Sequence, residues 1–159
     1  MLRSRVCQLV LAASVSLLVV VPAEAQTTYG VRAGIAADPD QLVVGGHIES
    51  PGLTSSGRLR VRPSVEIGIG DDSTVVAGNM DFVYVMSFPA SEWSTYFGGG
   101  PSFNIVHDDF AGNDIHGGAN FIAGFQHTTG LLLELRVGGG QGATGVKVMA
   151  GYVFNRNRN

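Results

Sequence analysis

The sequence predicts an all-β protein, an eight-stranded antiparallel up-and-down β-barrel. Of its 159 residues, 23 are glycine and 45% are hydrophobic, and the absence of a Gly-X-Y period excludes collagen. After residue 26 no stretch keeps the 3.6-residue apolar period of a helix. Two-residue alternation, the period of a strand, instead recurs almost to the end of the chain. The length suits a single domain.

The first 25 residues have the layout of a cleaved secretory signal peptide. A basic start (Arg3, Arg5) precedes an apolar run over 6–21, and Ala23-Glu24-Ala25 supplies the small residues of a cleavage site. An uncleaved anchor is the alternative, but about 16 apolar residues fall short of the roughly 20 that a spanning helix needs. Cys7, the only cysteine, lies in this segment. We expect a signal peptide at 1–25, a barrel at 26–154 and a short polar tail at 155–159.

Alternation places eight strands along the rest of the chain. In the clearest segment, 58–70, aliphatic side chains alternate with arginine, glutamate, serine and glycine, so the strand has one apolar and one polar face. The connections are rich in turn-forming residues. Pro63 and Pro101 fall inside strand patterns, where each removes a ladder hydrogen bond, so they predict weak pairing or bulges. The predicted strands cover residues 28–35, 41–49, 58–70, 74–87, 95–106, 117–127, 131–138 and 145–154.

The composition of the polar face shows whether the polar or the apolar face of the barrel is turned outward. A soluble barrel carries many mixed charges on its outer face, yet Lys147 is the only lysine in the chain. Nearly balanced charges among glycines suit a narrow interior filled by side chains, with the apolar face turned to lipid. We therefore predict a transmembrane β-barrel, although the same charges could line a narrow polar path. The inward cations are predicted to be Arg32, Arg58, Arg60, Arg62, Arg136 and Lys147, and the inward anions Glu49, Glu66, Asp81 and Glu134. The interior polar network is predicted to consist of Arg60, Arg62, Glu66, Asp81, Glu134 and Arg136.

The connections divide by composition between the two ends of such a barrel. Those after the first, third, fifth and seventh strands share one end, which would form an acidic outer rim. Its residues are Asp38, Asp40, Asp71, Asp72, Asp108, Asp109 and Asp114. The opposite end is predicted to carry an aromatic belt at the membrane interface. Its residues are Tyr29, Phe88, Trp93, Tyr96, Phe97, Tyr152 and Phe154.

Four segments of the C-terminal half carry a family resemblance. They are Tyr96-Phe97-Gly98-Gly99-Gly100-Pro101-Ser102-Phe103-Asn104, Phe121-Ile122-Ala123-Gly124-Phe125, Leu133-Glu134-Leu135-Arg136-Val137-Gly138 and Gly151-Tyr152-Val153-Phe154. With them the chain resembles the small eight-stranded outer-membrane β-barrel proteins of Gram-negative bacteria. The resemblance implies an outer-membrane location, contact with its lipid and lipopolysaccharide, and insertion by the barrel assembly machinery through a C-terminal signal, Tyr152 and Phe154. Here residues 155–159 follow the aromatic residue on which the family usually ends.

Membership in this family implies little about activity, since its members include structural proteins, adhesins, resistance factors and a few lipid A enzymes. We expect a monomer with a structural or surface-interaction role, without catalysis, cofactor or bound metal. A net charge of -3 argues against a nucleic-acid partner. One alternative is a soluble secreted or periplasmic β-barrel whose apolar face lines a cavity for a small apolar ligand. The other is a lipid A-modifying hydrolase using His127 with Thr128, Thr129 and Glu134, but alternation puts His127 and Glu134 on opposite faces.

Two motifs suggest other ligands. The segment 140–145 matches the dinucleotide fingerprint GxGxxG, but the helix and acidic residue that this fingerprint needs do not follow it, so it is interpreted as a hairpin loop. Imidazole and carboxylate groups gather in His107, Asp108, Asp109, Asp114 and His116, where they could hold zinc, manganese or calcium. The acidic rim as a whole could instead attract the divalent cations that bridge lipopolysaccharide phosphates.

Overall fold

The computed structural model describes residues 27–38, 40–71, 73–108, 112–140 and 145–154. The predicted signal peptide and polar tail lie outside these residues, as do Asp72 and Asp109. No helix in the described part of the chain is long and apolar enough to cross a membrane.

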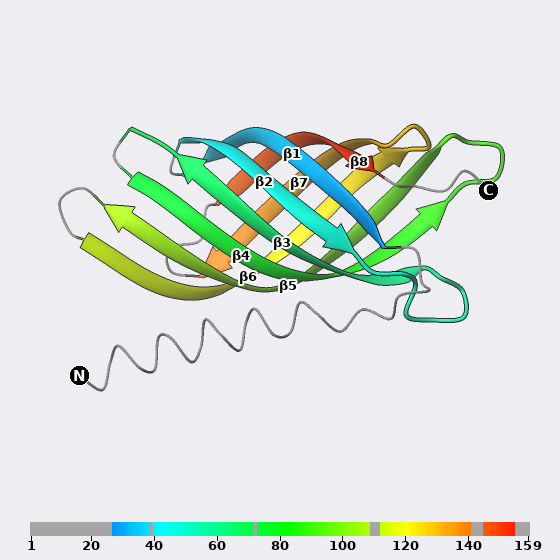
Figure 1. The fold of residues 1–159 in the computed structure, drawn as a ribbon, viewed down its shortest axis with the longest axis horizontal. Coiled ribbons are helices and arrows are strands. Elements are labelled where there is room, and N and C mark those ends of the chain that lie inside the picture. The colour runs from blue at the N-terminus through cyan, green and yellow to red at the C-terminus, as the bar shows by residue number, and fades with distance from the viewer. Residues whose placement is uncertain (1–26, 39, 72, 109–111, 141–144, 155–159) are drawn as a thin grey trace.

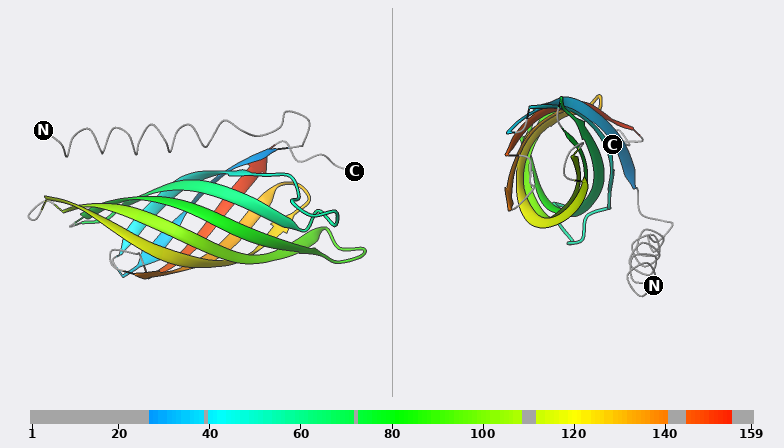
Figure 2. Two further views of the ribbon diagram at one scale, coloured as in Figure 1. Left: turned by 90° about the horizontal axis from the view of Figure 1, so that it is seen from below. Right: turned by 90° about the vertical axis from the view of Figure 1, so that its left-hand side faces the viewer.

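Eight strands, each antiparallel to its neighbours, close into a barrel in sequence order, because β1 pairs with β8 (Figure 1). The strands are tilted against the long axis of the barrel, and the end-on view shows a closed ring (Figure 2). Their bounds are β1 Thr28–Ala37, β2 Gln41–Glu49, β3 Leu59–Ile69, β4 Ser73–Ser87, β5 Trp93–Asp108, β6 Gly112–His127, β7 Leu131–Gly140 and β8 Val146–Phe154. The predicted fold class, an all-β eight-stranded antiparallel up-and-down barrel, is confirmed.

The strand bounds agree with the predicted ones to within two residues, except that β6 begins five residues earlier. The β5–β6 ladder runs without a break from Trp93↔His127 to Asp108↔Gly112. Glycine, asparagine and aspartate at the start of β6 indicated a loop, but pairing with β5 holds them in a strand. Local propensity is a weak guide to strand ends where cross-strand pairing continues.

The two prolines lie in continuous strands, so the predicted bulges are absent from β3 and β5. Pro63 stands opposite Met80 in the β3–β4 ladder. In the β4–β5 ladder, pairing stops after Asn79↔Ser102 and resumes at Phe82↔Gly99, with two residues between on each strand. Since no residue is inserted, Pro101 interrupts the hydrogen bonds without shifting the register.

We name the two ends of the barrel by what they carry. The terminal end holds the start of β1, the end of β8 and the connections β2–β3, β4–β5 and β6–β7. It lies on the right in Figure 1. The acidic end holds the connections β1–β2, β3–β4, β5–β6 and β7–β8. The charged interior lies between two buried apolar clusters. One, near the terminal end, contains Val83, Val85, Tyr96, Ile122, Leu132 and Val153. The other, near the acidic end, contains Ala36, Val43 and Met149.

Candidate functional site

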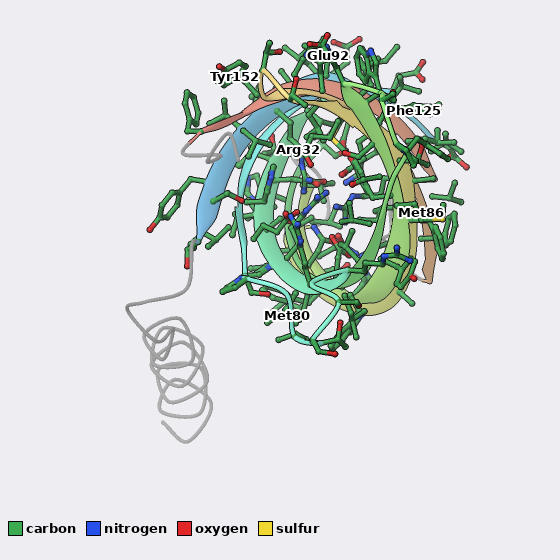
Figure 3. The ribbon with its side chains drawn as sticks, turned by 90° about the vertical axis from the view of Figure 1, so that its right-hand side faces the viewer. Arg32, Met80, Met86, Glu92, Phe125 and Tyr152 are labelled. Carbon is green, nitrogen blue, oxygen red and sulfur yellow. The ribbon has the colours of Figure 1, made fainter. Side chains whose placement is uncertain are left out.

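The inward face of the barrel holds a group of ionisable side chains, all buried except the half-buried Arg60, that we call the interior charge network. Alternation points one side chain of every two to the interior, and Figure 3 shows Arg32 inside the ring while Met80, Phe125 and Tyr152 lie outside it. The members come from β1, β2, β3, β4, β7 and β8. They are Arg32, Glu49, Arg60, Arg62, Glu66, Asp81, Glu134, Arg136 and Lys147.

Glu134 is the centre of the network. Its Oε1 accepts hydrogen bonds from Arg32 at 2.9 Å and from Arg136 at 3.2 Å. Its Oε2 accepts one from Arg62 at 3.1 Å and one from the hydroxyl of Tyr96 at 2.8 Å. A carboxylate with two oxygens and about four lone-pair sites is thus fully used. The side chain of Glu134 is completely buried.

The other three carboxylates extend the network in different directions. Glu66 accepts from Arg32 at 2.7 Å and from Lys147 at 2.8 Å. Asp81 pairs with Arg136 at 2.8 Å. Near the terminal end, Glu49 pairs with Arg60 at 2.5 Å and accepts from Nε of Arg62 at 2.8 Å. Six strands are therefore joined across the interior by charge-assisted hydrogen bonds, which are stronger than neutral ones.

Tyr96 donates a hydrogen bond to the interior charge network and is not part of the aromatic belt, so its predicted place in that belt was wrong. Tyr96 and Phe97 are consecutive in β5, and consecutive strand residues point to opposite faces. Phe97 is 42% exposed on the outside, whereas Tyr96 is fully buried. The guanidinium carbon of Arg62 lies 4.4 Å from the centroid of the Tyr96 ring, a cation–π distance. Gly124 makes room, because a side chain there would meet the Tyr96 hydroxyl.

All six residues predicted for the interior polar network lie in the interior charge network. Its remaining members Arg32, Glu49 and Lys147 were placed inward by alternation but were not expected to join it. The predicted inward position of Arg58 was wrong. This residue precedes the first residue of β3, is exposed, and approaches the hydroxyl of Tyr84 at 3.5 Å.

A row of uncharged polar side chains borders the network. Asn79 donates to the Ser64 hydroxyl at 3.3 Å, and Asn120 donates to Asn79 at 3.2 Å. Within the described residues, Nδ2 of Asn104, Oδ1 of Asn120 and both ring nitrogens of His47 have no hydrogen-bond partner. Buried polar atoms are usually satisfied, so these four atoms are exceptions within the otherwise hydrogen-bonded interior.

The acidic end carries the described members of the predicted acidic outer rim. Asp38 and Asp40 lie in the β1–β2 connection and Asp71 in the β3–β4 connection. Asp108 ends β5 and Asp114 lies near the start of β6, paired with Val106. The predicted metal ligands His107 and His116 stand opposite Asn113 and Asn104. Among the described residues no three His, Cys, Asp or Glu side chains are grouped as metal ligands.

His127 interacts with Glu92, whereas Glu134 lies in the barrel interior, so His127 and Glu134 are on opposite faces as alternation indicated. Its Nε2 lies 3.2 Å from Glu92, and its Nδ1 lies 2.8 Å from the hydroxyl of Thr129 and accepts from the Thr129 backbone N–H at 3.2 Å. The backbone of Thr128 also donates to the carbonyl of Glu92 at 2.9 Å. These contacts close the β6–β7 turn and tie it to the β4–β5 turn at the terminal end.

The described aromatic residues of the predicted belt, apart from Tyr96, are exposed near the terminal end. Trp93 packs edge-on against the His127 ring at 4.8 Å between centroids. Tyr152 and Phe154, the predicted C-terminal assembly signal, pack against each other at 5.1 Å. Phe154 stands opposite Tyr29 in the β1–β8 ladder that closes the barrel. These aromatic side chains form a partial ring around the terminal end.

Comparison with solved structures finds other eight-stranded barrels. Neisserial surface protein A matches with a TM-score of 0.58 at 13% sequence identity, over 81% of this chain and 95% of that chain. The N-terminal β-barrel domain of OprF from Pseudomonas aeruginosa matches with a TM-score of 0.57 at 16% identity, over 82% of this chain and 100% of that chain. No protein-family model and no curated protein sequence matches the chain. The predicted resemblance to small outer-membrane β-barrels is thus confirmed for the fold.

Proposed function

We propose that this chain is an integral protein of the Gram-negative outer membrane with a structural or surface-interaction role and no catalysis. One observation carries the proposal: no outward-facing position of the described strands bears Asp, Glu, Lys or Arg, while the interior is charged. A barrel dissolved in water would carry its charged side chains on the outside. A soluble barrel with an apolar ligand cavity would also need these apolar side chains inside. A closed barrel also satisfies its backbone groups without an edge, as hydrocarbon requires.

The proposal extends to orientation and partners. The outward apolar surface would contact outer-membrane lipid, and the acidic end would face lipopolysaccharide at the cell surface. The terminal end would then lie in the periplasm with its aromatic side chains at the inner interface. Tyr152 and Phe154 would engage the barrel assembly machinery during insertion. The chain would act as a monomer, since the lipid itself covers its apolar surface.

The location is tested by fractionating cells that produce the full chain. We expect the protein in the outer-membrane fraction, and we expect an unboiled sample to migrate differently from a boiled one on a detergent gel, because a closed barrel resists detergent until heated. Protein in the soluble fraction without a heat-dependent shift would contradict the proposal.

A charge on the outer face provides a second test. Leu135 is the fifth residue of β7, and its side chain points outward with 45% exposure. We expect Leu135→Arg to lower the free energy of unfolding in lipid vesicles by about 2–4 kcal/mol, the cost of arginine near the bilayer midplane. The measurement is urea unfolding followed by tryptophan fluorescence.

The matched control is Ser55→Arg in the exposed β2–β3 connection, which should leave stability nearly unchanged. If Leu135→Arg were equally harmless, the outer face would be in contact with water and the membrane proposal would fail.

A further inference from the structure

Part of β6 forms a free strand edge at the acidic end of the barrel. β5 and β6 stay paired as far as Asp108↔Gly112, whereas the β6–β7 ladder ends at Gly118↔Gly140. In the described part of the chain, residues 112–117 therefore pair on one side only. At about 3.4 Å per residue, this edge is roughly 20 Å long. Figure 1 shows β5 and β6 projecting beyond the other strands at this end, on the left.

This edge has few of the features that usually blunt a strand edge. Natural edges are protected by lysine or other charges, by proline or by a bulge. Residues 112–117 contain no lysine and no proline, and the β5–β6 ladder passes through them without an inserted residue. Every second residue of an edge strand turns its N–H and C=O groups away from its existing partner. Among the described residues nothing pairs with these groups, and an extended chain is the ligand that matches them in series.

The side chains along the edge indicate which kind of extended chain fits. On the outward face, Ile115 is 69% exposed and stands opposite Ile105 of β5. On the inward face, Asp114 is exposed and His116 is half-buried. An added strand would thus need apolar side chains on one face. On its other face it would meet a carboxylate at the acidic end, where basic side chains are favoured.

We propose that residues 112–117 of β6 bind an extended basic peptide by taking it up as a further strand. Main-chain hydrogen bonds to the free edge would supply affinity, and alternate side chains would supply specificity. Apolar residues of the peptide would contact Ile115, and lysine or arginine at the intervening positions would face Asp114. A second copy of the chain fits less well, because joining two such edges brings two acidic ends together.

The proposal deepens the surface-interaction role and rests on the proposed function for its location. With the acidic end at the cell surface, the free edge would be accessible to peptide segments outside the cell. Binding to the edge itself does not depend on that orientation, so the two can be tested separately.

The role of the backbone is tested on the purified protein in an amine-oxide detergent, by fluorescence anisotropy of a labelled peptide. The peptide alternates lysine and valine over six residues, the length of the free edge. We expect saturable binding with one peptide per chain. Two further peptides are methylated on the backbone nitrogens of either the lysines or the valines. Since one of these sets faces the edge, one of the two peptides should bind at least tenfold more weakly. Equal affinities of all three would reduce the interaction to charge attraction and overturn the proposal.

The position of the site is tested by substitution. Asp114→Lys should weaken binding of the lysine–valine peptide at least tenfold, and Ile115→Ser several-fold. Asp40→Lys is the matched control, because Asp40 is also exposed at the acidic end but lies in the β1–β2 connection. It should change the dissociation constant less than twofold, and weakening equal to that of Asp114→Lys would overturn the site. A heat-dependent gel shift, recorded for every variant, shows that the barrel is folded.

Hydrogen exchange locates the bound peptide independently. Amide exchange over 112–117 should slow when the peptide is added. Exchange over 121–126, which is paired on both sides, should not change. A chain that forms dimers dissociated by Ile115→Ser would assign the edge to a second copy and overturn the basic peptide.

Intact cells separate the edge from the orientation. Cells producing the unmodified protein should bind more peptide than cells producing Asp114→Lys. Equal binding to both, with a clear difference between the two purified proteins, would refute the proposed orientation and leave the edge site standing.

Discussion

Replacement of Glu134 by glutamine is expected to lower the free energy of unfolding of the barrel by about 3–5 kcal/mol, the typical cost of removing one partner from a buried ion pair. Glu134 accepts hydrogen bonds from Arg32, Arg62 and Arg136. Glutamine preserves the shape but removes the charge, which leaves three buried guanidinium groups undercompensated. Urea unfolding in lipid vesicles, followed by the fluorescence of the only tryptophan, measures the loss.

Glu92→Gln is the matched control for this change. Glu92 also forms an ion pair, with His127, but its side chain is 76% exposed, and exposed pairs contribute about 0–1 kcal/mol. Similar losses in the two variants would contradict a central role for Glu134.

A double-mutant cycle tests whether the interior charge network acts as a unit. Adding Arg136→Met to Glu134→Gln removes one of the guanidinium groups that have lost their partner, so the combined cost should be smaller than the sum of the single costs. Arg136 also pairs with Asp81, so the double variant should not regain full stability. Strictly additive costs would show that the two side chains are independent.

Replacement of Gly124 by alanine is expected to cost about 3 kcal/mol, at the upper end of the range for overpacking a closed interior. Gly124 faces inward on β6, where an added Cβ would overlap the carbonyl oxygen of Leu133 and the hydroxyl of Tyr96. The backbone of β7 cannot move without disturbing its ladder, and displacing Tyr96 would break its hydrogen bond to Glu134. The same unfolding measurement applies.

Gly117 gives a control on the same strand. It faces outward, and no atom lies within 4 Å of an added Cβ, so Gly117→Ala should be neutral. If Gly124→Ala were as stable as Gly117→Ala, the interior near Tyr96 would be looser than the structure indicates.

The faces of the strands and the order of the connections could be predicted from the sequence alone. Alternation is a local property of each strand, and it placed Arg62, Glu66, Glu134 and Arg136 inward before any partner was known. Chain order in an antiparallel barrel then assigned the described aspartates of the connections to one end. Where alternation was set aside, as for Tyr96, the prediction was wrong.

The contacts between inward side chains could not be predicted from the sequence, because they depend on how the strands are placed relative to one another. Arg62 and Glu134 are separated by 72 positions, and Gln41 at the start of β2 reaches Ser73 at the start of β4. Such contacts depend on the register of all eight ladders and on the tilt that closes the barrel, and two-residue periodicity contains neither. A register shift by two residues would keep every side chain on its face while changing the partners across the interior. The period of a strand specifies a direction for each side chain, whereas a contact requires the position of two strands at once.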